Sequence, residues 1–179
     1  LERTEQLVLN YPANLRLYTF PRNDFTTFER PRIRKSNLFD YYLLDLASAL
    51  PVFALDIEDG NNVADFCAAP GGKSLMLYLT LRRETRFFLN DLSLSRLDRL
   101  KRVFASFVPQ SEIRDSITFS HADATKLGLV DRFDRILLDA PCTNDRHSLF
   151  ESENNIFSRH RIAERVALPN RQLNLLFAA

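Results

Sequence analysis

The sequence has few of the residues that would indicate a disulfide-bonded, zinc-binding or membrane-spanning protein. Its 179 residues include two cysteines, three histidines and no tryptophan. Cys67 and Cys142 lie far apart and show no paired-cysteine spacing, so we expect neither a disulfide framework nor a bound metal. No run of about 18 apolar residues is present, so we expect no transmembrane helix. Two unpaired cysteines fit a reducing compartment.

The chain also has little net charge and few glycines. The formal net charge is +1, so the chain as a whole is not a polycation, and only four residues are glycine. The length and the hydrophobic content of 45% suit one globular domain with a real core. The sequence begins with Leu1 rather than Met and stops at Ala179, inside an apolar helical pattern without a capping signal. We therefore interpret the chain as a fragment or a processed piece.

The most informative stretch runs from Val63 to Ser74. It reads Val-Ala-Asp-Phe-Cys-Ala-Ala-Pro-Gly-Gly-Lys-Ser, which is a short apolar strand followed by a Pro-Gly-Gly turn. Apolar residues at helical spacing come next, so strand, glycine turn and helix follow one another. Glycine lets a backbone approach a ligand closely, and the first turn of a helix offers free N–H groups. The stretch therefore predicts a cofactor-binding turn that suits a carboxylate or a phosphate.

Two known phosphate-binding motifs fit this turn poorly. A dinucleotide fingerprint needs three spaced glycines, and only the adjacent pair Gly71-Gly72 is present. A P-loop matches at Gly72-Lys73-Ser74, but its first glycine position is occupied by Cys67. A purely structural turn stays open as an alternative.

The rest of the chain alternates between strand and helix patterns. Strands are predicted over residues 62–67, 86–91, 117–121 and 134–140, and helices over residues 38–50, 73–82, 94–107 and 161–179. The first of these helices is expected to end at Pro51. Strands that alternate with helices predict an α/β fold with a parallel sheet.

The first 37 residues differ from the rest of the chain, and we divide it into an N-terminal segment, 1–37, and a catalytic-type domain, 38–179. Residues 15–20 could form a short strand, and Pro21 and Pro31 interrupt the stretch behind it. Five cations are interleaved with two phenylalanines there: Arg22, Phe25, Phe28, Arg30, Arg32, Arg34 and Lys35. The segment is either an RNA-contacting arm, with cations for phosphate and rings for stacking, or a solvated linker.

Acidic residues lie at or near the predicted strand ends, where ligands bind in open α/β sheets. Asp65 lies two residues before the turn and could brace it by accepting backbone N–H groups. Asp91 ends the second strand about 20 residues beyond the turn, the usual position of a carboxylate that accepts both ribose hydroxyls. Its alternative role is to cap the helix that begins near Ser93.

Cys-Ala-Ala-Pro-Gly-Gly-Lys at 67–73 resembles motif I of the Sun-domain RNA cytosine-5 methyltransferases, and Asp139-Ala140-Pro141-Cys142 resembles their motif IV. Asn90-Asp91-Leu92-Ser93 and Ala122-Asp123 fall between them in the family's order. The resemblance covers about residues 39–179. It implies a Rossmann-like fold that binds S-adenosyl-L-methionine, with the parallel sheet truncated after the fourth strand and its following helix.

The resemblance also implies roles for individual residues. The turn formed by Cys67, Ala68, Ala69, Pro70, Gly71, Gly72 and Lys73 binds the cofactor, together with Asp91, Arg96, Asp123 and Asp139. Asp123 is expected to accept from the adenine amino group, and Asp139 to lie near the methionyl end and the target cytosine. Lys73 could pair with the cofactor carboxylate, and Arg96 could contact the ribose or the substrate backbone. Either cation could instead be an ordinary solvated charge.

The cysteines need separate roles. In this family the thiol that attacks cytosine C6 comes from a later Thr-Cys motif, and the Pro-Cys thiol helps release the product. Cys142 is therefore expected to be the release cysteine and not the nucleophile, with a buried inert cysteine as the alternative. Cys67 is expected to pack, with its backbone mattering more than its thiol. The attacking thiol is absent from this sequence, so we expect the chain alone to be inactive.

Within the family, residues 143–149 and 153–157 most resemble the mitochondrial branch that modifies small-subunit rRNA. A branch acting on a mitochondrial tRNA is the near alternative, and a non-catalytic RNA- or cofactor-binding scaffold is the alternative of another class. The resemblance further implies the mitochondrial matrix and a helical-repeat partner of the mitochondrial transcription-termination-factor family. Many hydrogen-bond donors between Thr143 and Arg165 could hold a flipped-out nucleotide, or could form a charged surface.

Overall fold

The fold is built on one parallel sheet, as the alternating pattern predicts. The computed structural model describes residues 15–80, 85–128, 131–144, 148 and 155–179. Its four strands are β1 (Asn62–Asp65), β2 (Arg86–Asn90), β3 (Ile117–Ser120) and β4 (Arg135–Leu137). They lie in the order β3-β2-β1-β4, and every neighbouring pair is parallel. The predicted α/β class is therefore confirmed.

Strand β1 lies inside the sheet and is covered on both faces. Val63 pairs with Phe87 of β2 on one side and with Arg135 of β4 on the other. Val63 and Ala64 point to opposite faces of the sheet, and both are completely buried. A strand buried on both faces has no solvent side, so its sequence is a continuous short apolar run rather than an alternating one.

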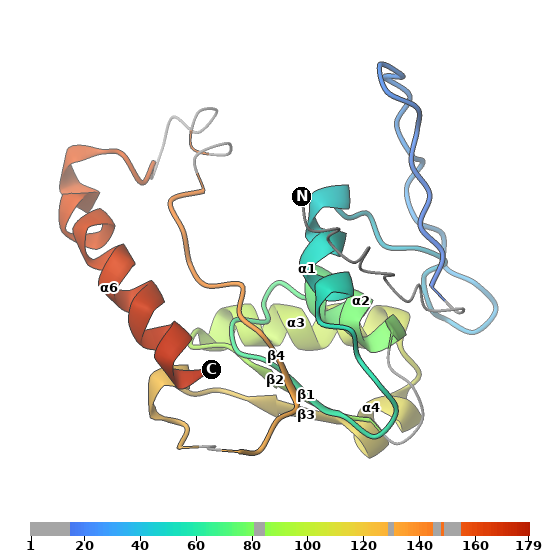
Figure 1. The fold of residues 1–179 in the computed structure, drawn as a ribbon. Helices are drawn as coiled ribbons and strands as arrows, with labels where there is room; N and C mark the ends of the chain where they lie inside the picture. Colours follow the sequence, from blue (N-terminus) through green and yellow to red (C-terminus); the bar gives the residue numbers. More distant parts are fainter. Residues whose placement is uncertain (1–14, 81–84, 129–130, 145–147, 149–154) are drawn as a thin grey trace, which may run out of the picture.

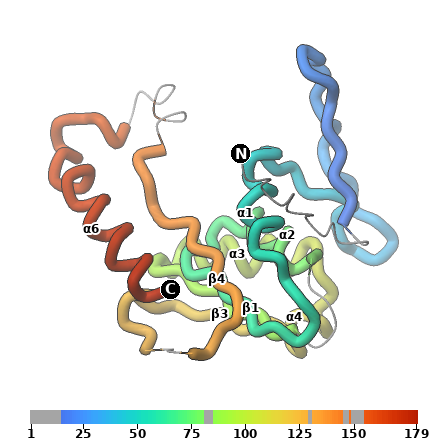
Figure 2. The backbone as a smooth tube through the Cα atoms, viewed as in Figure 1, coloured from blue at the N-terminus to red at the C-terminus, as the bar shows by residue number. Residues whose placement is uncertain are grey.

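Helices cover both faces of this sheet. On one face, α1 (Ala49–Ala54), α2 (Gly72–Thr80) and α3 (Leu94–Phe107) contribute to the larger core, to which α3 adds its buried stripe Leu97, Leu100 and Phe104. On the other face, α6 (Ile162–Ala178) places Leu175 against Ala64, Phe66 and Ala124. Figures 1 and 2 show α6 on the left, α1 and α2 on the right, and β4 between them. No helix in the described ranges is long and apolar enough to cross a membrane.

Two local predictions were wrong, and one helix was not predicted. The helix expected over 38–50 is replaced by a 3-10 turn, Leu46–Ser48, followed by α1, which contains Pro51 near its start. Proline is tolerated there because the first N–H groups of a helix have no intrahelical acceptor, so Pro51 opens this helix instead of ending one. Residues 15–20 form no strand, and the short helix α4 (Gln110–Ser116) was not predicted.

Candidate functional site

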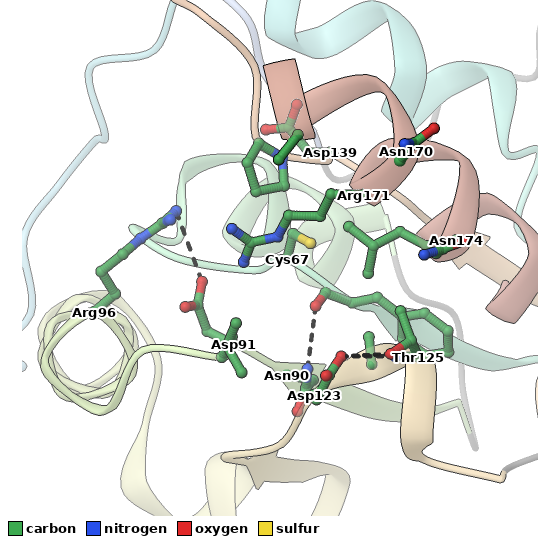
Figure 3. A pocket seen from close by; sticks show the side chains of 16 residues that line it. Cys67, Asn90, Asp91, Arg96, Asp123, Thr125, Asp139, Asn170, Arg171 and Asn174 are labelled. Atoms are coloured by element: carbon green, nitrogen blue, oxygen red, sulfur yellow. Dashed lines mark hydrogen bonds and ion pairs between the residues drawn. The ribbon is translucent and has the colours of Figure 1, made fainter. Parts of the chain in front are cut away.

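A cavity of about 470 Å³ lies at the carboxyl ends of the strands. Its walls come from the ends of β1 and β2, the start of α3, the turn after β3, the segment after β4, and α6 (Figure 3). The lining residues are Phe66, Cys67, Asn90, Asp91, Leu92, Arg96, Asp123, Ala124, Thr125, Asp139, Pro141, Ala167, Asn170, Arg171, Asn174 and Leu175. The structure thus brings together five of the residues predicted for the site, namely Cys67, Asp91, Arg96, Asp123 and Asp139.

The glycine turn beside the cavity is packed too closely for larger residues. Gly71 has a φ of +118°, which side-chain-bearing residues rarely adopt. A Cβ atom added to Gly71 would lie 2.9 Å from Cδ1 of Leu100, and one added to Gly72 would lie 2.8 Å from Cδ1 of Leu44. The two glycines therefore let the turn pack between α3 and residues 42–44. Helix α2 begins directly behind it, where the N–H of Leu75 donates to Gly71 O at 2.7 Å.

Asp65 braces this turn from below. The side chain is 1% exposed and accepts the N–H of Cys67 at 3.2 Å and the hydroxyl of Ser74 at 2.7 Å. These two bonds tie the end of β1 to the first turn of α2, which confirms the bracing predicted for Asp65. Burial raises the pKa of Asp65 to about 7, against the opposing effect of the Ser74 and Cys67 hydrogen bonds.

Asp91 both lines the cavity and supports its floor. One carboxylate oxygen accepts the N–H of Ala69 at 3.2 Å, and the other accepts the N–H of Ser93 at 2.9 Å. Arg96 lies 3.7 Å from Asp91 and also donates to the carbonyl oxygen of Ala69. The capping alternative is wrong as stated, because Ser93 is the N-cap residue of α3 and Asp91 accepts the N–H of Ser93 itself. A carboxylate has about four lone-pair sites, so these contacts leave acceptor capacity facing the cavity.

Asn90 is a residue that the sequence analysis missed. It is completely buried, and its side-chain amide donates to the carbonyl oxygens of Phe66 at 3.2 Å and Ala122 at 3.0 Å. Its side-chain oxygen accepts the N–H of Ala122 at 3.1 Å. One amide therefore joins the carboxyl ends of β1 and β3 across β2, which fixes the spacing of the cavity walls. Its position next to Asp91 at a strand end was the only signal in the sequence.

The other two carboxylates are more exposed. The Asp123 side chain, 37% exposed, accepts the N–H of Thr125 at 3.1 Å and the Thr125 hydroxyl at 2.8 Å. These hydrogen bonds lower the pKa of Asp123, the side-chain bond most strongly. Asp139 is 52% exposed and pairs with Lys73 at 2.7 Å. The cation predicted to meet a ligand carboxylate is thus held by Asp139 in this structure.

Several predicted residues do not line the cavity. Within the part of the chain that the structure describes, the residues that line the cavity do not include Ala68 to Gly72, Lys73 or Cys142. Cys142 is exposed, so the alternative of a buried inert cysteine is wrong. Burial, together with the charges of Asp65 and Asp91, raises the pKa of the Cys67 thiol to about 11, so Cys67 stays protonated and is a poor nucleophile.

Helix α6 supplies a wall that the sequence analysis did not assign to the site. Asn170, Arg171 and Asn174 line the cavity, and Figure 3 shows the Arg171 guanidinium reaching across its mouth toward Cys67. Gln172 donates to the carbonyl oxygen of Pro141 at 2.8 Å, which ties α6 to the segment that carries Asp139 and Cys142. The spacing of Asn170, Arg171 and Asn174 in the sequence predicts that they lie on one face of a helix. It does not predict which part of the protein that face would contact.

A comparison of the sequence with protein families identifies the family to which a cavity of this kind belongs. Residues 52–179 match the family model described as 16S rRNA methyltransferase RsmB/F. The chain belongs to the RsmB/F family of RNA cytosine-5 methyltransferases. Its fold is therefore that of an S-adenosylmethionine-dependent methyltransferase, as the resemblance implied.

Curated relatives in the RsmB/F family include two proteins from Mus musculus. The 5-cytosine rRNA methyltransferase NSUN4 is 48% identical over 174 residues, which is 95% of this chain and 45% of that protein. The mitochondrial tRNA (cytosine(34)-C(5))-methyltransferase is 38% identical over 172 residues, which is 95% of this chain and 48% of that protein. The chain thus spans less than half the length of these relatives.

Two solved structures from Pyrococcus horikoshii share the fold. A methyltransferase homolog protein superimposes with a TM-score of 0.54 at 29% identity, covering 76% of this chain and 40% of that one. NSun6, solved with SFG, superimposes with a TM-score of 0.59 at 22% identity, covering 81% of this chain and 35% of that one.

Proposed function

We propose that this protein transfers a methyl group from S-adenosylmethionine to C5 of cytosine in mitochondrial small-subunit rRNA. The observation that carries the proposal is the convergence of Asp91, Asp123 and Asp139 on one cavity beside a glycine turn. Membership of the RsmB/F family supports the reaction class, and the higher identity to an rRNA enzyme than to a tRNA enzyme supports the substrate.

The residues of the cavity suit S-adenosylmethionine. The volume of about 470 Å³ falls in the usual range for small-molecule sites. Asp91 would accept the two ribose hydroxyls, Asp123 the adenine amino group, and Asp139 the ammonium of the methionyl end. The cofactor supplies an electrophilic methyl group on a positively charged sulfur. The exposed acceptors of Asp123 and Asp139 are free to change partners when a ligand enters.

At the end of the site that receives cytosine we place Asp139, close to the target base, and Cys142. Cytosine C5 is a poor nucleophile, so a thiolate must first add to C6 and make C5 reactive. After methylation a base removes the C5 proton, the C5=C6 double bond re-forms, and the C6–S bond breaks, which releases the attacking thiolate. We assign Cys142, an exposed thiol three residues beyond Asp139, to this release step and the attack to a second thiol. Cys67 does not fit the attacking role because its pKa is raised to about 11.

The test follows a labelled methyl group into RNA with the complete protein. We expect label at C5 of cytosine in mitochondrial small-subunit rRNA and much less in mitochondrial tRNA. Preferential labelling of tRNA would favour the second branch, and cofactor binding without transfer to either RNA would favour a non-catalytic scaffold. We propose a helical-repeat protein of the mitochondrial transcription-termination-factor family as the partner, to be added if the complete protein alone transfers slowly. We propose the mitochondrial matrix as the compartment.

Cys142→Ala separates the two cysteine roles. The variant should still form the covalent protein–RNA adduct, because attack belongs to another thiol, but it should resolve the adduct slowly. Denaturing gels should therefore show cross-linked protein accumulating with the variant and not with the unchanged protein. A variant that forms no adduct would make Cys142 the nucleophile.

A further inference from the structure

The N-terminal part of the described chain forms a projecting arm, which we define as residues 16–35. The chain runs outward, turns at Pro21–Asp24 and returns, and Figures 1 and 2 show the two stretches side by side and standing away from the sheet. The turn is closed by the N–H of Asp24, which donates to Pro21 O at 3.1 Å, and Asn23 has a positive φ of 69°. The N–H of Thr26 donates to the Asp24 carboxylate at 2.9 Å. The tip is therefore an ordered turn.

Contacts at the base hold the arm to the domain. Leu15, directly before the arm, is buried in the main core. The ring centroids of Phe20, on the outgoing stretch, and Phe28, on the returning stretch, lie 4.5 Å apart. Behind the arm, the N–H of Phe39 donates to Ser106 O of α3 at 2.9 Å, and its ring lies 5.5 Å from that of Phe107. The arm is therefore presented from a fixed base.

The arm concentrates positive charge. It carries six arginines and lysines and two acidic residues, whereas the whole chain has a net charge of only +1, so the remainder is net negative. Arg32 pairs with Glu29. Among the described residues, no ion pair involves the other five cations, and all of these are exposed: Arg16, Arg22, Arg30, Arg34 and Lys35. Their charge is available to an anionic partner.

Aromatic side chains lie exposed among these cations. Phe25, next to the tip, is 92% exposed, and Tyr18 is 70% exposed. Phe28 packs on Phe20 and Tyr41 and so belongs to the arm's own support. The ring of Phe25 thus stands free of the protein's own aromatic cluster and is available to stack. Unpaired cations beside an exposed ring match a strand of phosphates with unstacked bases.

We propose that the arm binds single-stranded RNA, with Phe25 stacking on a base and the neighbouring arginines contacting phosphates. The inference rests on the proposed function in that RNA is the substrate, but it places a contact surface away from the cavity. Figure 1 shows the arm and α6, which forms a cavity wall, on opposite sides of the molecule. The arm therefore contacts nucleotides that flank the target and not the target itself. This surface raises affinity for a stretch of RNA without taking part in methyl transfer.

The test measures fluorescence anisotropy of a labelled 20-nucleotide single-stranded RNA with the complete protein at several salt concentrations. Phe25→Leu, which keeps an apolar side chain but removes the ring, should weaken binding about tenfold, and Phe25→Trp should retain it. Arg22→Gln with Arg34→Gln should lower the slope of log affinity against log salt by about 1.4, or 0.7 for each lost phosphate contact. The matched control, Arg99→Gln with Arg102→Gln, removes two exposed charges from α3 and should leave the slope unchanged.

Cofactor titration of the same variants separates this inference from the proposed function. Arm variants should bind S-adenosylmethionine as the unchanged protein does while losing RNA affinity. If Phe25→Leu and the arginine pair keep full RNA affinity in a protein that binds both RNA and cofactor, the arm is not an RNA surface and the proposed function stands. The same conclusion follows if these variants lose a protein partner and keep RNA. A complete protein that binds neither RNA nor cofactor would overturn both proposals.

Discussion

The two sides of the cavity use the same residue type in opposite ways. On the turn side, Asp65 and Asp91 are 1% and 3% exposed, and each accepts protein hydrogen bonds at the glycine turn or beside it. On the open side, the side chains of Asp123 and Asp139 are 37% and 52% exposed, and within the described ranges their hydrogen bonds and ion pairs are with Thr125, Lys126 and Lys73. The comparison indicates that the turn side shapes the site, while the open side is available to change partners with a ligand.

Burial explains the difference. A buried carboxylate is costly unless hydrogen bonds compensate it, so Asp65 and Asp91 are tied to backbone N–H groups that themselves need acceptors. Exposed ion pairs contribute about 0–1 kcal/mol, so the Lys73–Asp139 pair can separate at little cost. Changes on the turn side should therefore act on stability, and at Asp91, which also lines the cavity, on binding as well. Changes on the open side should act mainly on binding.

The largest effect is expected for Gly71→Ala. The φ of +118° strains any residue with a Cβ atom, and that atom would lie 2.9 Å from Leu100, which is completely buried. We expect a loss of about 3 kcal/mol or more in the free energy of unfolding, measured by urea denaturation.

Gly60→Ala is the matched control for Gly71. Gly60 also has a positive φ, +80°, but no atom lies within 4 Å of an added Cβ. Its substitution should cost about 1 kcal/mol, from backbone strain alone. Equal losses for the two variants would show that close packing of the glycine turn does not matter.

A pH-dependent effect is expected from Asp65. Its pKa is raised from the ordinary 3.8 to about 7 by burial, so the folded state holds a proton that the unfolded state has released between these values. The contribution of Asp65 to stability is therefore fully present below about pH 4 and is lost as the pH rises toward 7. Asp65→Asn cannot titrate and should remove this fall, as urea denaturation at several pH values would show. An unchanged pH profile in the variant would mean that Asp65 is ionised in the fold at all these pH values.

The smallest effect on stability is expected for Asp139→Ala. The side chain is half exposed and pairs with Lys73 at the surface, so the free energy of unfolding should change by less than about 1 kcal/mol. Affinity for S-adenosylmethionine should nevertheless fall about tenfold, because a charge-assisted hydrogen bond is lost. Calorimetric titration beside urea denaturation measures both quantities. A large loss of stability with unchanged affinity would reverse the roles assigned to the two sides.

The sequence predicted the sheet and the turn because both depend on local patterns. Short apolar runs marked β1 to β4, and the adjacent Gly71 and Gly72 marked the tight turn. The bracing role of Asp65 followed from its distance of two residues from the turn, and the structure confirms it. The strands are shorter than predicted. For β4 the reason is that apolar residues continue in the sequence beyond Leu137, the last residue of the strand.

The wall formed by α6 could not be predicted in the same way. Asn170, Arg171 and Asn174 reach the cavity only because Leu175 packs on the far face of the sheet, a contact between residues more than 50 positions apart. Local periodicity gives a helix but not the surface that it meets. The role of Asn90 was missed for a related reason, because its three hydrogen bonds reach residues 24 and 32 positions away, at the ends of the two strands that flank β2 in the sheet.

A calorimetric titration of the complete protein with S-adenosylmethionine tests whether the cavity holds the cofactor through Asp91. Asp91→Ala should weaken binding by about 2–4 kcal/mol, since two charge-assisted hydrogen bonds to the ribose are lost. Asp91→Asn, which keeps an acceptor for one backbone N–H, should show a smaller loss, and Asp98→Ala, on an exposed position of α3, should show none. Unchanged affinity in a folded Asp91→Ala variant would remove Asp91 from the cofactor site and contradict the assignment of this cavity.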